Sequence, residues 1–309
     1  MIGTVGCGDS NTTPRFANIA FLSNRPANQP AQLFVAKLDG TSVTLVPNAP
    51  SGYSPSISAD FTRVAYEFSS NIFVENVDGT GQAQLTTSNN SYFARISPNG
   101  RKIVYSEYSG SPASYHFWIS NIDGTGKLDL TPATLVSVGQ CFTGSFSADS
   151  SQVVFICYNA GSFSMYITKA DGTGVKTVIQ PSNLFLDSPS FTPDSKKIVL
   201  YANGPVTLTA QRSGGTLLFT PGVRHEFKVR QKGSSIPTYG VTSINVDGTG
   251  PVLLVPGSYE SVILNSTLYY TLHSSTLNHN QIYKAKVDGT NPVSISDGTS
   301  NDYLGQSQN

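Results

Sequence analysis

The feature of this 309-residue sequence that most constrains its fold is a short motif, Asp-Gly-Thr, that recurs along the whole chain. Its six copies begin at Asp39, Asp78, Asp123, Asp171, Asp247 and Asp288. Successive copies are 39, 45, 48, 76 and 41 residues apart, and a degenerate copy, Arg212–Thr216, lies within the long interval. Seven copies at a period near 42 residues predict a repeat protein, in which each copy marks one structural unit.

The residues around each copy predict a turn between two strands. An aromatic or β-branched run precedes the motif, as at 71–74, and a short apolar run follows it, as at 252–255. Asp-Gly favours a tight turn there, because Gly takes a positive φ without steric cost and Asp binds the local backbone. A second turn motif recurs upstream at 58–61, 97–100, 147–150 and 192–195, each time followed by another apolar run. Each unit should therefore hold four antiparallel strands, which is one blade of a β-propeller.

We predict an all-β fold, a single β-propeller of four-stranded antiparallel blades that covers residues 14–309. Seven blades fit the motif count, and six are the alternative because residues 217–246 are short for a full blade. No amphipathic helical pattern interrupts the units, which excludes a parallel sheet with crossover helices. The first unit begins with a second-strand pattern at 18–23, while residues 301–306 resemble a first strand. We expect this C-terminal strand to complete the first blade and remove an open sheet edge.

The combination of Ser-Pro-Asn-Gly at 97–100 with Asp-Gly-Thr-Gly at 123–126 resembles the propeller repeats of TolB-type periplasmic proteins. The same repeats occur in the propellers of prolyl oligopeptidase-like peptidases and of some sugar lyases. The resemblance covers nearly the whole chain and implies the fold much more than a function. Two departures stand out: TolB-like proteins carry an N-terminal α/β domain, which we do not expect ahead of residue 14, and their propeller has six blades.

Residues 1–13 are small and polar, so we expect a flexible N-terminal arm. The residues around Cys7 resemble the end of a bacterial lipoprotein signal, although six residues before the cysteine are too few for its apolar region. Cys7 is therefore either a lipidation site in a signal remnant or an ordinary thiol. Lipid on Cys7 is the only membrane attachment that we expect, because no run of 18 apolar residues predicts a transmembrane helix.

Charge limits the classes of partner. Lys and Arg number 19, as do Asp and Glu, so the formal net charge is zero, which excludes nucleic-acid binding by bulk electrostatics. Charged residues make up 12% of the chain, against a usual share of about 25%. A surface built from Ser, Thr, Asn, Gln and Gly is common outside the cytosol, so we predict a secreted, periplasmic or cell-surface location.

Two of the three cysteines lie on either side of the turn at 147–150. A hairpin turn centred on Asp149 places Cys141 opposite Cys157 on adjacent antiparallel strands. We predict a disulfide between them, which requires an oxidising compartment. Two buried free thiols are the alternative.

The search for catalytic chemistry finds little. The four histidines, His116, His225, His273 and His279, show no metal-ligand spacing, and neither a G-x-S-x-G elbow nor a P-loop occurs. Each Asp-Gly-Thr copy supplies one carboxylate, whereas a Ca²⁺ site takes 6–8 oxygens. We predict no catalytic, cofactor-binding or metal-binding residue, so replacing His225, His273 or Glu260 should leave the function intact. The alternative is that loops bring His225 and His273 together at one mouth of the channel.

Three functions fit these observations. We expect a non-catalytic interaction or scaffold module of the bacterial cell envelope or extracellular space, which binds a protein partner or self-associates. The alternative is a polysaccharide lyase or hydrolase with its site in the central channel. A sensor or ligand carrier that uses the same channel is the third.

Overall fold

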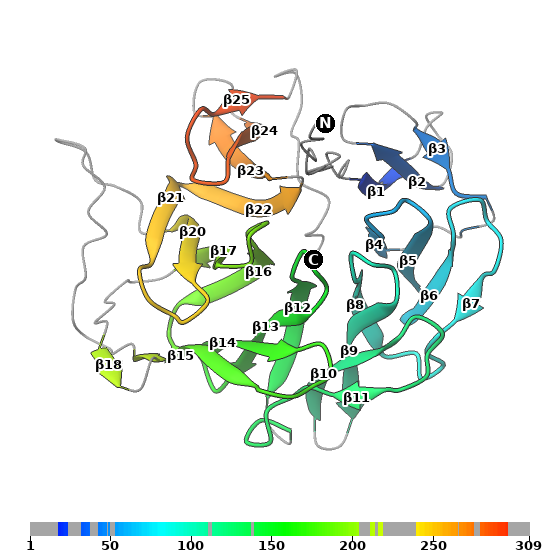
Figure 1. The fold of residues 1–309 in the computed structure, drawn as a ribbon, viewed down its shortest axis with the longest axis horizontal. Coiled ribbons are helices and arrows are strands. Elements are labelled where there is room, and N and C mark those ends of the chain that lie inside the picture. The colour runs from blue at the N-terminus through cyan, green and yellow to red at the C-terminus, as the bar shows by residue number, and fades with distance from the viewer. Residues whose placement is uncertain are drawn as a thin grey trace, which may run out of the picture.

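The computed structural model describes residues 18–23, 32–37, 43–47, 49, 53–110, 113–136, 139–203, 211–213, 216–218, 239–264, 266–274 and 279–295. These residues form strands and turns in an all-β fold, as the sequence predicts (Figure 1). Within this part of the chain, no helix is long and apolar enough to cross a membrane.

Apart from one short hairpin, the described strands group into six units of consecutive antiparallel neighbours, and a single parallel contact, Tyr115↔Gln140, joins the third and fourth units into one sheet. Unit 1 holds β1 (Asn18–Ser23), β2 (Gln32–Lys37) and β3 (Thr44–Leu45). Unit 2 holds β4 (Tyr53–Ile57), β5 (Arg63–Phe68), β6 (Asn71–Asn76) and β7 (Ala83–Gln84). Unit 3 holds β8 (Ser91–Ile96), β9 (Lys102–Gly110), β10 (Ala113–Asn121) and β11 (Leu128–Asp129).

The remaining units follow the same order. Unit 4 holds β12 (Gln140–Phe146), β13 (Gln152–Asn159), β14 (Ser162–Lys169) and β15 (Lys176–Ser182). Unit 5 holds β16 (Phe185–Phe191), β17 (Lys197–Asn203), β20 (Gly240–Asn245) and β21 (Val252–Pro256). Unit 6 holds β22 (Ser258–Leu264), β23 (Thr267–Ser274), β24 (His279–Lys286) and β25 (Val293–Ser294).

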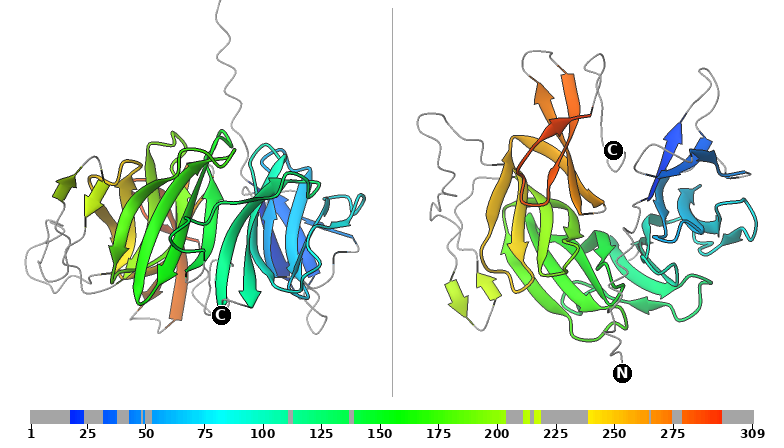
Figure 2. Two further views of the ribbon diagram at one scale, coloured as in Figure 1. Left: turned by 90° about the horizontal axis from the view of Figure 1, so that it is seen from below. Right: turned by 45° about the horizontal axis from the view of Figure 1, so that its top comes forward.

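The units stand around a common centre, with the first strands of units 2–6 innermost and the short last strands outermost (Figure 1). Seen from the side, the strands run from one face of the molecule to the other (Figure 2). Because neighbouring strands are antiparallel, the turn after a first strand and the turn after a third strand lie at the same face. Both recurring sequence motifs therefore lie at one end of the molecule.

Local hydrogen bonds explain why the Asp-Gly-Thr motifs form turns. The backbone N–H and the hydroxyl of Thr80 both donate to Asp78 Oδ1, at 2.9 and 2.6 Å, and Asn76 N–H donates to the Thr80 carbonyl at 2.9 Å. Gly79 takes a φ of 80°, which glycine adopts at no steric cost. The same bonds recur in the later copies that begin at Asp123, Asp171, Asp247 and Asp288.

The hydrophobic core lies between neighbouring units. One cluster joins units 3 and 4, where the rings of Phe117 and Phe155 stack with their centroids 4.8 Å apart. Another joins units 4 and 5 around Ile156, Leu186 and Leu200. Each unit is thus stabilised mainly by its neighbours, as expected for a repeat protein.

The prediction of a seventh blade does not agree with the described strand pairing. Strand β17 pairs directly with β20, from Lys197↔Asn245 to Ala202↔Gly240, so no described strand lies between them in the sheet. Inside that interval the degenerate Arg212–Thr216 copy falls on β18 (Gln211–Ser213) and β19 (Thr216–Leu218), which pair with each other, and β19 meets β15 at Ile179↔Leu217. The long motif spacing therefore falls between two paired strands of unit 5, which favours the six-blade alternative among the described strands, and the blade count stays a prediction.

Two other predictions fall on residues outside the described part of the chain. The arm at 1–13 and the proposed closing strand at 301–306 both lie there. Unit 1 shows three strands among the described residues, with β1 paired to β2 as a second strand would be. Closure by the C-terminus stays a prediction.

Candidate functional site

The inner strands of units 2–6 share an irregularity. Each has a register shift against the second strand of its own unit, for example between Tyr92 and Arg95 in β8 and between Asp187 and Ser190 in β16. At three of these shifts a residue other than glycine has a positive φ: 49° at Ser54, 59° at Phe93 and 49° at Ser188. Such bulges redirect side chains and are frequent beside functional sites.

Arg95 breaks the repeat at one of these bulges. The inner strands of units 2–5 end in an apolar residue followed by Ser or Thr, which aligns them without gaps. The residue just before that pair is Ser56, Ser145 or Ser190 in three units, and Arg95 in unit 3. The serines join neighbouring inner strands: Ser145 Oγ donates to the Pro189 carbonyl at 2.8 Å, and Ser56 Oγ accepts from Ile96 N–H at 3.0 Å.

Asp187 breaks the repeat in unit 5, where the other aligned strands carry an aromatic residue, Tyr53, Tyr92 or Phe142. The charges of the two exceptions influence each other: burial lowers the pKa of the Arg95 guanidinium, and the negative charge of Asp187 opposes that shift.

The backbone around Arg95 also takes part. Arg95 Nη1 donates to the carbonyl of Ala94 at 2.8 Å and to that of Ser54, in the bulge of the neighbouring inner strand, at 3.4 Å. Burial raises the pKa of the half-buried Glu67 in β5, and a hydrogen bond from the Phe93 backbone N–H opposes this shift. The inner strands of units 2–5 and β5 thus place a guanidinium and two carboxyl groups, from Arg95, Asp187 and Glu67, beside Ser and aromatic side chains, and these groups can recognise polar and charged ligands.

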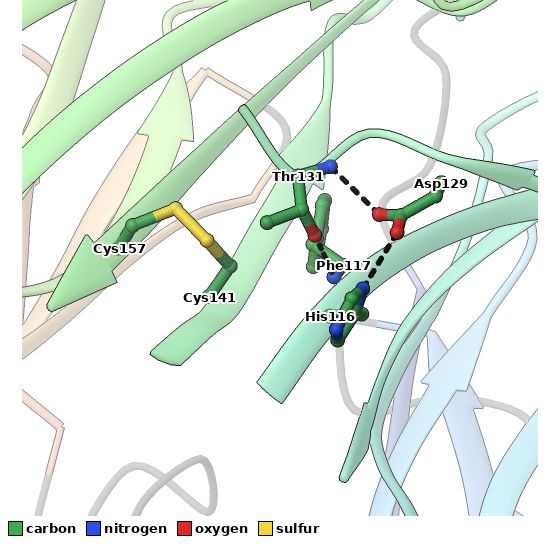
Figure 3. Close-up of a disulfide and its surroundings, with 6 residues drawn as sticks. All are labelled: His116, Phe117, Asp129, Thr131, Cys141 and Cys157. Atoms are coloured by element: carbon green, nitrogen blue, oxygen red, sulfur yellow. Dashed lines mark hydrogen bonds and ion pairs between the residues drawn. A yellow bond between two sulfur atoms is a disulfide. The ribbon is translucent and has the colours of Figure 1, made fainter. Parts of the chain in front are cut away.

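His116 lies elsewhere, in the third strand of unit 3 (Figure 3). Its Nδ1 is 2.6 Å from Asp129 Oδ2, and its Nε2 is 3.2 Å from Ser114 Oγ. Asp129 Oδ1 accepts from the Thr131 N–H at 2.8 Å. The order of these contacts is that of a Ser-His-Asp triad, but Ser114 is 1% exposed and its hydroxyl also contacts the Val136 carbonyl at 3.2 Å. A substrate does not reach a nucleophile so placed, so the contacts serve the packing of β10 and β11.

Cys141 and Cys157 face each other on β12 and β13, both buried, and the structure joins their sulfurs at 2.05 Å (Figure 3). The bulge between Phe142 and Gly144 shifts the register so that Cys141 lies opposite Cys157. Continuing the register of Phe146↔Val153 without a bulge would set Tyr158 against Cys141. Cys7 lies outside the described residues, so its lipidation stays a prediction.

The other candidate residues are placed only in part. His225 lies outside the described residues, His273 falls in β23, His279 begins β24, and Glu260 in β22 pairs with Thr271. Across the described ranges, no group of three or more His, Cys, Asp and Glu side chains is placed to hold a metal ion. The motif search missed Arg95, Asp187 and Glu67. Aligning the inner strands would have revealed the first two as exceptions to the repeat.

No family model and no curated protein matches the sequence. Among solved structures, TolB from Acinetobacter baumannii is similar at 17% identity and a TM-score of 0.59, over 88% of this chain and 62% of that one. This chain thus spans less than two thirds of the length of that TolB.

Two further structures are similar over most of this chain. An oligogalacturonate lyase from Vibrio parahaemolyticus matches at 11% identity and a TM-score of 0.61, over 94% of this chain and 77% of that one. The β-propeller domain of the Trilobed protease from Pyrococcus furiosus matches at 12% identity and a TM-score of 0.56, over 91% and 82%. Identities this low establish the fold alone. The chain therefore has the fold of a TolB-like β-propeller.

Proposed function

We propose that the protein is a non-catalytic interaction module of the bacterial cell envelope or extracellular space, and that it binds a protein partner at the centre of the ring. The observation that carries this proposal is the pair of oppositely charged exceptions, Arg95 and Asp187, at positions where the aligned inner strands carry Ser or aromatic residues.

Stability alone does not account for this pair. Taking two charges out of water costs more than their attraction returns unless the geometry is excellent, so a buried ion pair is often no better than neutral residues of similar size. At the position of Arg95 the other three aligned strands carry serine, and at the position of Asp187 the other three carry an aromatic residue. Both residues also flank bulges in which a non-glycine residue has a positive φ, a conformation that costs on the order of 1–3 kcal/mol. Backbone strain and two opposite, partly exposed charges at one place support a binding role.

Location and assembly belong to the same proposal. The bond between Cys141 and Cys157 is of the kind that persists in oxidising compartments, which supports a periplasmic, secreted or cell-surface protein. A net charge of zero puts little repulsion between copies, which favours self-association. Lipid on Cys7 would tether the module to a membrane.

The test is affinity capture with the purified full-length chain as bait in an envelope extract, quantified by mass spectrometry. Arg95→Ser and Asp187→Tyr place at each position a residue that the aligned strands already carry, so both variants should fold. Truncating one partner of a buried charge pair at an interface typically costs 2–5 kcal/mol, so we expect capture of the partner to fall at least about tenfold. Lys196→Ser, which removes an exposed charge from the turn between β16 and β17 at the turn-bearing face, is the matched control. A partner captured equally by all variants, or no captured protein at all, contradicts the proposal.

The second candidate is a polysaccharide lyase or hydrolase, which the similarity to an oligogalacturonate lyase favours. Incubating the protein with polygalacturonate and with neutral polysaccharides, with and without EDTA, tests it. New unsaturated ends would indicate a lyase, and new reducing ends without unsaturation a hydrolase. If neither forms above the level of a heat-inactivated sample, the enzyme reading fails for these substrates.

A further inference from the structure

A pocket of about 430 Å³ opens between units 2 and 3, at the face that carries the recurring turns. Its wall includes two arginines, Arg63 at the start of β5 and Arg101 in the turn before β9, together with Asn99 and the carboxylates of Asp60 and Asp123. A volume of this size suits a small molecule, since ligand pockets typically span about 300–1,000 Å³.

Asn99 is an exception to the repeat within this pocket. The equivalent turns carry Asp60, Asp149 and Asp194. Asn99 makes the same bonds that an aspartate makes there, because its Oδ1 accepts from Ser97 Oγ at 2.8 Å and from Arg101 N–H at 3.1 Å. With Oδ1 used by the turn, the remaining polar atom is the donor Nδ2, where the other turns have a carboxylate oxygen. The pocket therefore lacks one negative charge and has one more hydrogen-bond donor.

The two arginines add to this donor capacity. Both are exposed, and among the described residues neither guanidinium has a carboxylate within 4.0 Å. A guanidinium presents five N–H donors in a planar fork that matches a carboxylate or phosphate with two parallel bonds.

The two aspartates of the pocket are already engaged by their own turns. Asp60 Oδ1 accepts from Ser58 Oγ at 2.6 Å, and Asp123 Oδ1 accepts from Thr125 Oγ1 at 2.7 Å. Hydrogen bonds from Thr125 lower the pKa of Asp123, and the positive charge of Arg63 acts in the same direction. The donors of Arg63, Arg101 and Asn99 are the groups that remain to meet a ligand, while the outer oxygens of the aspartates can accept from hydroxyl groups on it.

We propose that this pocket binds a small polar molecule through an oxyanion group, a phosphate or a carboxylate, held between Arg63 and Arg101 and hydrogen-bonded by Asn99. The site lies at the turn-bearing face, apart from the inner-strand residues Arg95 and Asp187, and it does not depend on the function proposed for them.

The test is calorimetric titration of the full-length protein with inorganic phosphate and, in a separate arm, with citrate. The key variant is Asn99→Asp, which restores the residue of the other turns, so the turn should form unchanged while a negative charge enters the pocket. We expect wild type to bind at least one probe in the millimolar range or tighter. Asn99→Asp and the pair Arg63→Gln with Arg101→Gln should each weaken binding at least tenfold.

The matched control is Asp149→Asn, the reverse exchange at the equivalent turn of unit 4, which should bind like wild type. Equal thermal midpoints of wild type and Asn99→Asp establish that folding is unchanged. Binding of phosphate alone identifies a phosphate ligand, and binding of citrate alone a carboxylate. Absence of binding to both probes, or equal binding by Asn99→Asp, overturns the proposal, as does an equal loss in Asp149→Asn.

Discussion

Removing the disulfide between Cys141 and Cys157 should lower the stability of the folded chain by a predictable amount. The appropriate change is to alanine at both positions, because both residues are buried and a serine would bring an unpaired hydroxyl into the core. The cross-link closes a loop with a sequence separation of 16 residues. In the chain-entropy model a loop of this length restricts the unfolded state by about 3 kcal/mol at 25 °C.

This loss should appear as a shift of the melting midpoint. An entropy of unfolding of about 2.1 cal/mol/K per residue amounts to about 0.65 kcal/mol/K for a chain of this length, so a loss of about 3 kcal/mol should lower the melting midpoint of the double variant by roughly 5 °C. Fluorescence-monitored melts of both proteins without reductant measure the difference. Peptide mapping without reductant should show the two cysteines linked in wild type.

The control is the same pair of melts after full reduction of the denatured proteins and refolding in reductant. Wild type should then lose most of its advantage, because the cross-link no longer restricts its unfolded chain. Equal midpoints under oxidising conditions, or two cysteines that label as free thiols in native oxidised protein, would refute the reasoning.

Three further predictions concern the turns and the chain end. Gly79→Ala should lower the free energy of unfolding more than Gly161→Ala in chemical denaturation. Both positions have a positive φ that costs alanine about 1–2 kcal/mol, but a Cβ at Gly79 would lie 2.8 Å from the Pro47 carbonyl oxygen, whereas a Cβ at Gly161 would have no atom within 4 Å. Equal losses would contradict this. Hydrogen bonds from the threonine of each motif lower the pKa of Asp78 and its equivalents below the ordinary value of 3.8, so their contribution to stability is present above that pH and is lost as the pH falls through the lowered pKa. Melts in buffers of decreasing pH should therefore show a steeper loss below about pH 4 in wild type than in Thr80→Val, and parallel curves would contradict this. Deleting residues 300–309 should lower the melting midpoint or the solubility if they close the ring, and an unchanged melt would place the closing strand elsewhere.

The repeat was readable from sequence because its turns are local. The Asp78–Thr80 bonds join residues two positions apart, so the residues that form the turn also appear together in the sequence. The motif count did not reveal the pairing within unit 5, because in the sequence a degenerate copy that marks a further blade looks the same as extra residues between two paired strands. Only the pairing of β17 with β20 distinguishes the two cases. That pairing joins strands separated by residues 204–239, and no local signal reports it.

The all-β class, the four-stranded unit and the face that bears the turns can be read from the sequence, since each follows from turn chemistry and strand patterning over a few residues. The tertiary structure decided how many units the described strands form, which charges meet and where a pocket opens. Arg95 and Asp187 are 92 residues apart in the chain, and Arg63 and Arg101 are 38 apart. Their proximity depends on how whole units pack around the ring. That packing is set by the many side chains buried between neighbouring units, so the local sequence around each of these residues does not reveal it.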